Sequence, residues 1–442
     1  MADGCSTSLS SHESKAHRKV LALALAVTCM STGALAQNKR SSARKPAASS
    51  RAAAVHNSAI VIDTHADTPG RFVDENFDIG SDAGGGHIDL AKIKKGNLGA
   101  EFFSIWVDPE KYKGDYAHRA LDMIDSVHEQ VRRHPQDMVM AYSAEDIVRA
   151  RTGPHKRLAT LIGVEGGHAI ENDIRILRNF YRLGARYMTL TWMNTNEWAD
   201  ASGDDTNPQV QHHGGLTPFG KDIVLEMNRL GMMVDVSHVS DKTFWDVINT
   251  TKAPLIASHS SARALTNHYR NMDDSMLRAM AKNGGVVQVN FASFFDDQVF
   301  LTQYQLQQPA IKQSFQELDA RLKDASPEVR ASEHEKLEEE WTKRIPRPPF
   351  KSLIDHIDHI AKVAGVDHVG LGSDFDGITS APEGIDSAAD LPRITEALMA
   401  RGYTAQDMQK ILGGNLLRVF RDVERVSRQM KAQGEKSVAA AK

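Results

Sequence analysis

The chain has 442 residues, of which 25% are charged and 41% hydrophobic, and its formal net charge is −4. This length accommodates one large domain or two to three ordinary ones, and the mixed composition excludes a disordered chain. The small negative charge does not favour nucleic acid or an anionic membrane surface as a partner. No apolar run reaches the roughly 18 to 20 residues of a membrane span.

The N-terminus has the three parts of a secretory signal peptide. Basic residues between Lys15 and Lys19 precede the apolar run 20–27, and small residues before Gln37 predict cleavage after Ala36. Residues 1–36 are therefore expected to be removed, with export across the inner membrane to the periplasm. A short amphipathic helix is the alternative. Residues 37–57 are small, polar and basic, which is typical of a flexible leader.

Both cysteines, Cys5 and Cys29, fall inside the expected signal peptide. Cys29 could instead mark a lipoprotein, although Thr28 before it fits that processing poorly. A mature chain without cysteine has no disulfide, no thiol nucleophile and no thiolate metal site.

From residue 58 onward, short apolar runs alternate with amphipathic helical segments. The expected strands cover residues 59–64, 101–107, 159–164, 187–192, 232–237, 254–258, 285–291 and 368–373, with 138–142 ambiguous. The expected helices cover residues 117–133, 174–183, 218–230, 241–249, 273–282, 353–363 and 391–401. Near-continuous apolar runs are typical of parallel strands buried on both faces. Eight such units predict an α/β fold, a closed TIM-type (β/α)8 barrel over residues 58–420.

One segment interrupts this alternation. Residues 296–349 are rich in Gln, Glu, Lys and Arg and predict a polar helical insertion after the seventh strand. Insertions at that end of a barrel strand extend the catalytic rim, so the segment is either a solvated hairpin or a lid or dimer surface. Residues 421–442 are expected to form a C-terminal tail, frayed from Lys431 onward.

Histidine or carboxylate side chains stand at the ends of five expected strands. Because the carboxyl ends of parallel barrel strands share one rim, these side chains can converge although they are far apart in sequence. A buried charge must be paired or bound to metal, and apolar strands offer no other reason for it. Five ligands exceed one tetrahedral zinc and fit two ions that share a carboxylate. The predicted ligands are His65, Asp67, Glu165, His238 and His259, with Glu165 as the bridge.

Asp374 ends the eighth expected strand and would be a sixth ligand. A carboxylate that takes a proton from the bridging water and passes it to a leaving amine is the better interpretation. A structural partner of a ligand histidine is the alternative. Asp376 is expected to stabilise the following loop.

The motifs around these residues resemble the membrane (renal) dipeptidase family of dinuclear zinc peptidases. The matching stretches are Ile62-Asp-Thr-His-Ala-Asp-Thr-Pro69, Gly163-Val-Glu-Gly-Gly-His168, Asp235-Val-Ser-His238, Ser258-His-Ser-Ser-Ala262, Arg270-Asn271 and Gly370-Leu-Gly-Ser-Asp-Phe-Asp-Gly377. The likeness runs in order from about residue 58 to 420.

The resemblance implies a bacterial secreted metallodipeptidase with an amidohydrolase-like barrel and two Zn²⁺ per chain. It implies metal binding by the same five residues, an acid/base role for Asp374, and binding of the substrate carboxylate by Arg270. Small dipeptides would be the substrates and a homodimer the assembly. The chain ends without a hydrophobic tail, so no lipid anchor is expected.

One position departs from the family pattern. The mammalian members have a histidine at the end of the fourth strand, where this chain has Trp192. An indole N–H donates one hydrogen bond but carries no proton charge. Asn194 or Asn196 could supply the missing donor, so Trp192 and Asn194 are the expected substrate-binding residues.

Three functions follow from these observations. The first is a zinc dipeptidase that acts through a metal-bridging hydroxide. The second is a metallohydrolase of the same fold acting on a lactone, an N-acyl amino acid or a phosphoester, since fold does not fix substrate. The third is a non-catalytic binding or assembly protein. The complete set of predicted metal ligands argues against this third function.

Overall fold

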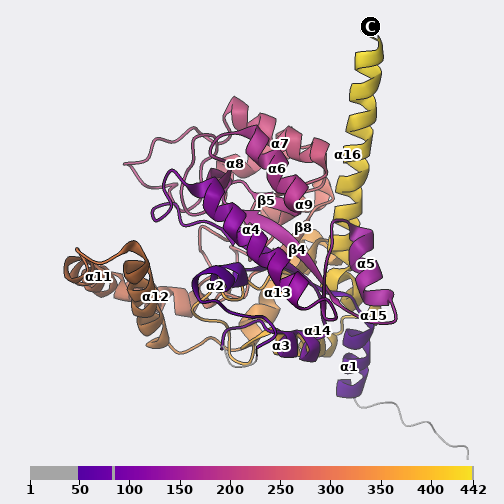
Figure 1. Ribbon diagram of the computed structural model, residues 1–442. Coiled ribbons are helices and arrows are strands. Elements are labelled where there is room, and N and C mark those ends of the chain that lie inside the picture. Colours follow the sequence, from indigo (N-terminus) through magenta and orange to yellow (C-terminus); the bar gives the residue numbers. More distant parts are fainter. Residues whose placement is uncertain (1–47, 82–84, 441–442) are drawn as a thin grey trace, which may run out of the picture. The chain divides into compact units, whose positions relative to one another are not determined.

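The computed structural model describes residues 48–81 and 85–440 and consists of parallel strands with helices around them (Figure 1). The signal peptide expected at 1–36, both cysteines and most of the expected leader lie outside these residues. The strands are β1 (Val61–Ala66), β2 (Leu98–Trp106), β3 (Met138–Met140), β4 (Leu158–Glu165), β5 (Ala185–Thr189), β6 (Met233–Asp235), β7 (Ile256–Ala257), β8 (Val286–Val289) and β9 (Val369–Leu371).

Eight of these strands close into a barrel. Each neighbouring pair is parallel, in the order β2-β1-β9-β8-β7-β6-β5-β4, and a pairing of β2 with β4 closes the ring. The ambiguous run at 138–142 forms β3, which pairs with residues 158–160 of β4 outside the ring. The predicted TIM-type (β/α)8 barrel is therefore confirmed.

Helices alternate with the strands as the amphipathic segments predict. The barrel helices include α2 (Thr68–Asp74), α3 (Leu90–Lys95), α4 (Tyr116–Arg133), α5 (Ala144–Thr152), α6 (Ile174–Leu183), α7 (Pro218–Leu230), α8 (Asp241–Thr250), α9 (Asp274–Asn283), α13 (Lys351–Ala364), α14 (Leu391–Ala400) and α15 (Ala405–Gln409). Helix α7 shows how the sequence marks the two ends of a helix. Thr217 accepts a hydrogen bond from Gly220 N, Pro218 opens the first turn, and Gly231 ends the helix at φ 92°.

A tyrosine crosses the barrel interior. Tyr187 on β5 is fully buried, and its hydroxyl donates to the carbonyl of Thr64 on β1 at 3.0 Å. The ring occupies the space beside Gly163 on β4, where a Cβ atom would lie 2.0 Å from it. Strand β4 therefore needs glycine at this position.

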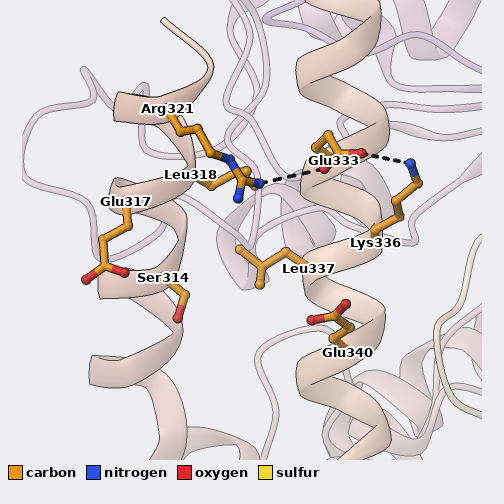
Figure 2. A pocket seen from close by; sticks show the side chains of 8 residues that line it. All are labelled: Ser314, Glu317, Leu318, Arg321, Glu333, Lys336, Leu337 and Glu340. Atoms are coloured by element: carbon orange, nitrogen blue, oxygen red, sulfur yellow. Dashed lines mark hydrogen bonds and ion pairs between the residues drawn. The ribbon is translucent and has the colours of Figure 1, made fainter.

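The segment after β8, the seventh strand of the barrel, is helical. It contains α10 (Ser293–Asp296), α11 (Gln298–Arg321) and α12 (Pro327–Lys343), and α11 and α12 lie side by side as a hairpin. A hollow of about 490 Å³ separates them (Figure 2). Glu333 pairs there with Arg321 at 3.7 Å and with Lys336 at 2.8 Å. The other lining residues are Ser314, Glu317, Leu318, Leu337 and Glu340.

Both ends of the described chain are more ordered than the sequence predicts. The expected leader ends in helix α1 (Ala48–Ser58), where His56 is buried and bonds to the carbonyl of Gly96 at 2.8 Å. The expected tail from residue 421 belongs to helix α16 (Asn415–Ala440), because Val423 and Ser427 are buried against the barrel domain. None of the helices described here combines the length and apolar character that a membrane crossing requires.

Candidate metal centre

The five predicted ligands meet at the carboxyl-terminal rim of the barrel. Glu165 lies between the histidines: its Oε2 is 3.3 Å from Nε2 of His65, and its Oε1 is 2.9 Å from Nε2 of His238. Nε2 of His259 is 3.4 Å from the same Oε1. Oδ2 of Asp67 lies 3.6 Å from Nε2 of His65. The two oxygens of Glu165 thus face different imidazoles, as a bridging carboxylate requires.

Two site residues hold an unusual backbone conformation. His238 has φ 67° and Asp374 has φ 62°, in the left-handed region that residues with a Cβ atom rarely adopt. Such strain costs of order 1–3 kcal/mol per residue and persists where the surrounding structure enforces it. Here it aims both side chains at the centre of the rim.

The electrostatics favour neutral imidazoles at His238 and His259 and an ionised carboxylate at Glu165. Burial opposes the charged form of His65, but the Tyr187 hydroxyl and the nearby carboxylates raise the pKa of His65 well above its ordinary value. Burial lowers the pKa of His238 to about 3 and takes the pKa of His259 well below its ordinary value. Burial opposes ionisation of Glu165, but His65 and the hydrogen bonds from the other imidazoles bring the pKa of Glu165 well below its usual range. Neutral imidazole nitrogens and a carboxylate are the donor set that zinc prefers.

Neighbouring side chains orient the rings. Nδ1 of His65 lies 2.8 Å from the Tyr187 hydroxyl, which donates its own proton to Thr64, so the ring donates at Nδ1 and leaves Nε2 free. Nδ1 of His259 lies 2.8 Å from Oγ of Ser258, and that hydroxyl donates to Asp235 at 2.5 Å. Hydrogen bonds at the second ring nitrogen fix the tautomer that binds metal through the first.

Asp374 lies beside the cluster, and a neighbouring amide holds one of its carboxylate oxygens. Its Oδ1 is 4.0 Å from Nε2 of His65, and its Oδ2 accepts a hydrogen bond from Asn290 at 2.8 Å. Ligand atoms of Asp374, His65 and Asp67 all lie within 4.8 Å of one another, as do those of His65, Glu165 and His259. Asp376 instead accepts from Thr68 and from the backbone N–H of His87, which anchors the loop.

Arg270 is a buried cation near the same centre. The residue is 4% exposed, and its guanidinium donates to the carbonyl oxygen of His259 at 3.1 Å. Within residues 48–81 and 85–440, no carboxylate oxygen lies within 4 Å of its nitrogens. A buried guanidinium without an ion-pair partner is costly and suits an anionic ligand.

The residues after β5 form the aromatic side of the site. The Trp192 ring lies 5.0 Å from that of Trp106 and 6.4 Å from that of His238. Oδ1 of Asn194 is buried and has no hydrogen-bond partner among the described residues. Asn196, the alternative donor, instead holds its own loop: it donates to Leu190 O and accepts from the backbone after it.

Sequence reasoning missed several polar neighbours. Asn290 directly follows β8, so the strand-end signal that found the carboxylates would have found it if amides had been included. Ser104, a polar residue within an apolar strand, donates to Glu165 at 3.2 Å. Trp106 lies two residues further along the same strand face. No local signal marks Tyr187, which acts across the barrel.

Comparisons with known proteins match one family over most of the chain. The family profile described as "Membrane dipeptidase (Peptidase family M19)" matches residues 49–434. Dipeptidase tcpJ of Claviceps purpurea is 33% identical over 368 residues, which cover 81% of this chain and 74% of that relative.

Solved structures extend the similarity. The probable dipeptidase PvdM of Pseudomonas aeruginosa has a TM-score of 0.73 at 26% identity, covering 86% of this chain and 99% of its own. A metallopeptidase of Rhodobacter sphaeroides, liganded with a phosphinate mimic of the dipeptide L-Ala-D-Ala, has a TM-score of 0.65 at 25% identity, covering 83% and 99%.

Proposed function

Since the chain belongs to the membrane dipeptidase family of metallopeptidases, M19, we propose that it hydrolyses dipeptides with two zinc ions held at the barrel rim. The observation that carries this proposal is the meeting of three imidazoles and two carboxylates at one point. Nε2 of His65 and Oδ1 of Asp67 are buried and have no hydrogen-bond partner in the described part of the chain. Buried nitrogen and oxygen atoms that lack a hydrogen-bond partner are suited to bind a metal ion.

The donor set divides naturally between two ions. His65 and Asp67 would hold one ion, His238 and His259 the other, and Glu165 would bridge them. Bound zinc supplies a Lewis acid for the scissile carbonyl and lowers the pKa of water so that hydroxide is available at neutral pH. The remaining steps belong to the protein side chains.

Asp374 is the proposed acid/base. Asn290 occupies its Oδ2, which leaves Oδ1 to take the proton from the attacking water. The same atom then returns the proton to the leaving amine. The left-handed backbone at Asp374 holds the carboxylate over the cluster while it does so.

Arg270 is proposed to bind the carboxylate at the C-terminal end of the substrate. The guanidinium is buried next to His259, so a carboxylate bound there would lie within one residue of the metal pair. A carboxylate held so close to the metal pair would limit the substrates to dipeptides. Trp192 and Asn194 would also contact the substrate, with the Asn194 amide as hydrogen-bond donor.

Export and assembly complete the proposal. The N-terminal signal supports a periplasmic location, which cell fractionation would test. A homodimer is the proposed assembly, to be tested by light scattering of the purified protein.

The decisive experiment for the proposed activity uses the purified protein and a panel of L,L and L,D dipeptides. We expect amino-acid release that chelator abolishes and zinc restores. In Asp374→Asn, kcat should fall by about 10² to 10⁴ because proton transfer is lost, while bound zinc stays at the wild-type level. Asp376→Asn, two residues away, is the control and should retain kcat. No metal-dependent release from any dipeptide would reject the proposed function.

A further inference from the structure

The loop that carries Arg270 is packed against the start of the helical insertion. It connects β7 to α9, and α10 lies beside it. The centre of the Arg270 guanidinium lies 5.4 Å from the centroid of the Phe295 ring on α10. Within the part of the chain that the structure describes, the guanidinium donates hydrogen bonds to His259 O and, at 3.5 Å, to Ser260 alone. The orientation of the planar group therefore depends strongly on what it packs against.

Asn271 joins this loop to the insertion. The residue is 1% exposed, and its amide Nδ2 donates to Thr266 O at 2.9 Å and to Phe295 O at 2.8 Å. The Asn271 side chain therefore ties the loop to itself at Thr266 and also ties the loop to α10. Both acceptors are carbonyl oxygens, so this position needs a side chain with two N–H donors, which the Asn271 amide supplies.

Two further contacts join the residues before Arg270 to the insertion. The side chain of Gln298, the first residue of α11, accepts from the backbone N–H of Asn267 at 2.7 Å. The ring of His268 lies 4.8 Å from that of Phe295. The insertion thus contacts the loop on both sides of Arg270, whereas α12 adds none of these bonds.

We infer that Asn271 and Phe295 are positioning residues that hold the Arg270 guanidinium in the orientation that binds the substrate carboxylate. The insertion after β8 therefore contributes to substrate binding through its first two helices. This inference rests on the role proposed for Arg270. On this inference, the base of the insertion supports the substrate site, whereas the outer hairpin around the hollow of Figure 2 has no part in it.

The test is steady-state kinetics of Asn271→Asp and Phe295→Leu with L-Ala-L-Ala and L-Ala-D-Ala. Aspartate keeps the shape of asparagine but donates no hydrogen bond, and leucine removes the ring under the guanidinium. We expect KM to rise about tenfold in each variant, with kcat within about twofold and zinc content unchanged, as for lost uniform binding. Phe315→Leu, which removes a ring that packs on His334 in the outer hairpin, is the matched control and should keep the wild-type KM.

A double variant separates positioning from general destabilisation. Arg270→Ala should raise KM at least as much as Asn271→Asp, and adding Asn271→Asp to it should raise KM no further. Full additivity, or an unchanged KM in both Asn271→Asp and Phe295→Leu, would overturn the inference while leaving the dipeptidase activity intact. An unchanged KM in Arg270→Ala would overturn this inference and the role of Arg270 together. Circular dichroism identifies a variant that fails to fold, in which case the other one decides.

Discussion

At the residue scale, the chemistry of the rim depends on side chains that do not themselves face a substrate. Ser258 is fully buried between His259 and Asp235, and its hydroxyl accepts from the imidazole while donating to the carboxylate. Asp235 also accepts from the Thr189 hydroxyl and from two backbone N–H groups, at Ser237 and Ser258. This carboxylate is fully satisfied, so it holds the serine, and through it the ring of His259, in one orientation.

Replacing Ser258 by alanine should therefore weaken zinc binding without removing a ligand. We expect a loss of about 10- to 100-fold in zinc affinity, measured by titration against a competing chelator, because the His259 ring loses the partner that fixes its tautomer. Ser261→Ala is the matched control: Ser261 is equally buried but donates to Asp296 at 2.9 Å. Equal zinc affinities in the two variants would contradict the positioning role of Ser258.

Some residues of the site could be predicted from sequence patterns, and others could not. The strand-end histidines and carboxylates were predictable because each follows an apolar run that ends at one rim. Tyr187 and Ser104 were not, since their partners lie on other strands and are fixed only by the closure and register of the barrel. Asn196 was offered as a substrate donor, but its bonds to its own loop leave no such freedom.

At the element scale, the positions of the strands followed from apolar runs, whereas their lengths did not. Strand β7 is only Ile256–Ala257, shorter than the expected 254–258. The reason lies in Ser258, whose N–H donates to the Asp235 side chain, and in Ser260, whose N–H donates to Gln288 O. A side-chain acceptor, the Asp235 carboxylate, thus interrupts the regular ladder at Ser258, where the site begins, and no local pattern reveals this.

Helix α13 supports the loop after β7 through a histidine that must stay neutral. His356 is 1% exposed, and its Nδ1 accepts from the backbone N–H of Ala262 at 3.0 Å. Burial lowers the pKa of His356 to about 4 from its ordinary 6.5. Between these values the unfolded chain binds more protons than the folded one, so folding stability falls as the pH falls from 6.5 towards 4.

We therefore expect His356→Gln to lose less stability on acidification than the wild type. Glutamine keeps a neutral acceptor and does not titrate. The free energy of unfolding, measured with urea at pH 7 and pH 5 in the presence of chelator, should drop by about 2 kcal/mol more in the wild type than in the variant. The same drop in both proteins would show that His356 is not a source of the acid sensitivity.

At the scale of the whole molecule, the alternation of strands and helices was enough to predict a closed barrel, while the two ends were misjudged. Helix α1 is built from small residues of low hydrophobicity, and its order comes from contacts such as that of His56 with Gly96. Residues 421–442 were expected to form a tail, yet Val423, like Phe420 just before it in helix α16, is fully buried. Tertiary packing, rather than local composition, decides both ends.

The closed barrel brings residues that are distant in sequence to one point. The number of zinc ions bound per chain is the most direct test of this account. Zinc per chain should be measured by elemental analysis of the protein loaded with excess zinc and freed of loosely bound metal. The account predicts two zinc ions per chain, since five ligands with one shared carboxylate exceed the coordination of a single ion. A chain that retains no zinc under these conditions would contradict the claim that the rim cluster is a metal centre.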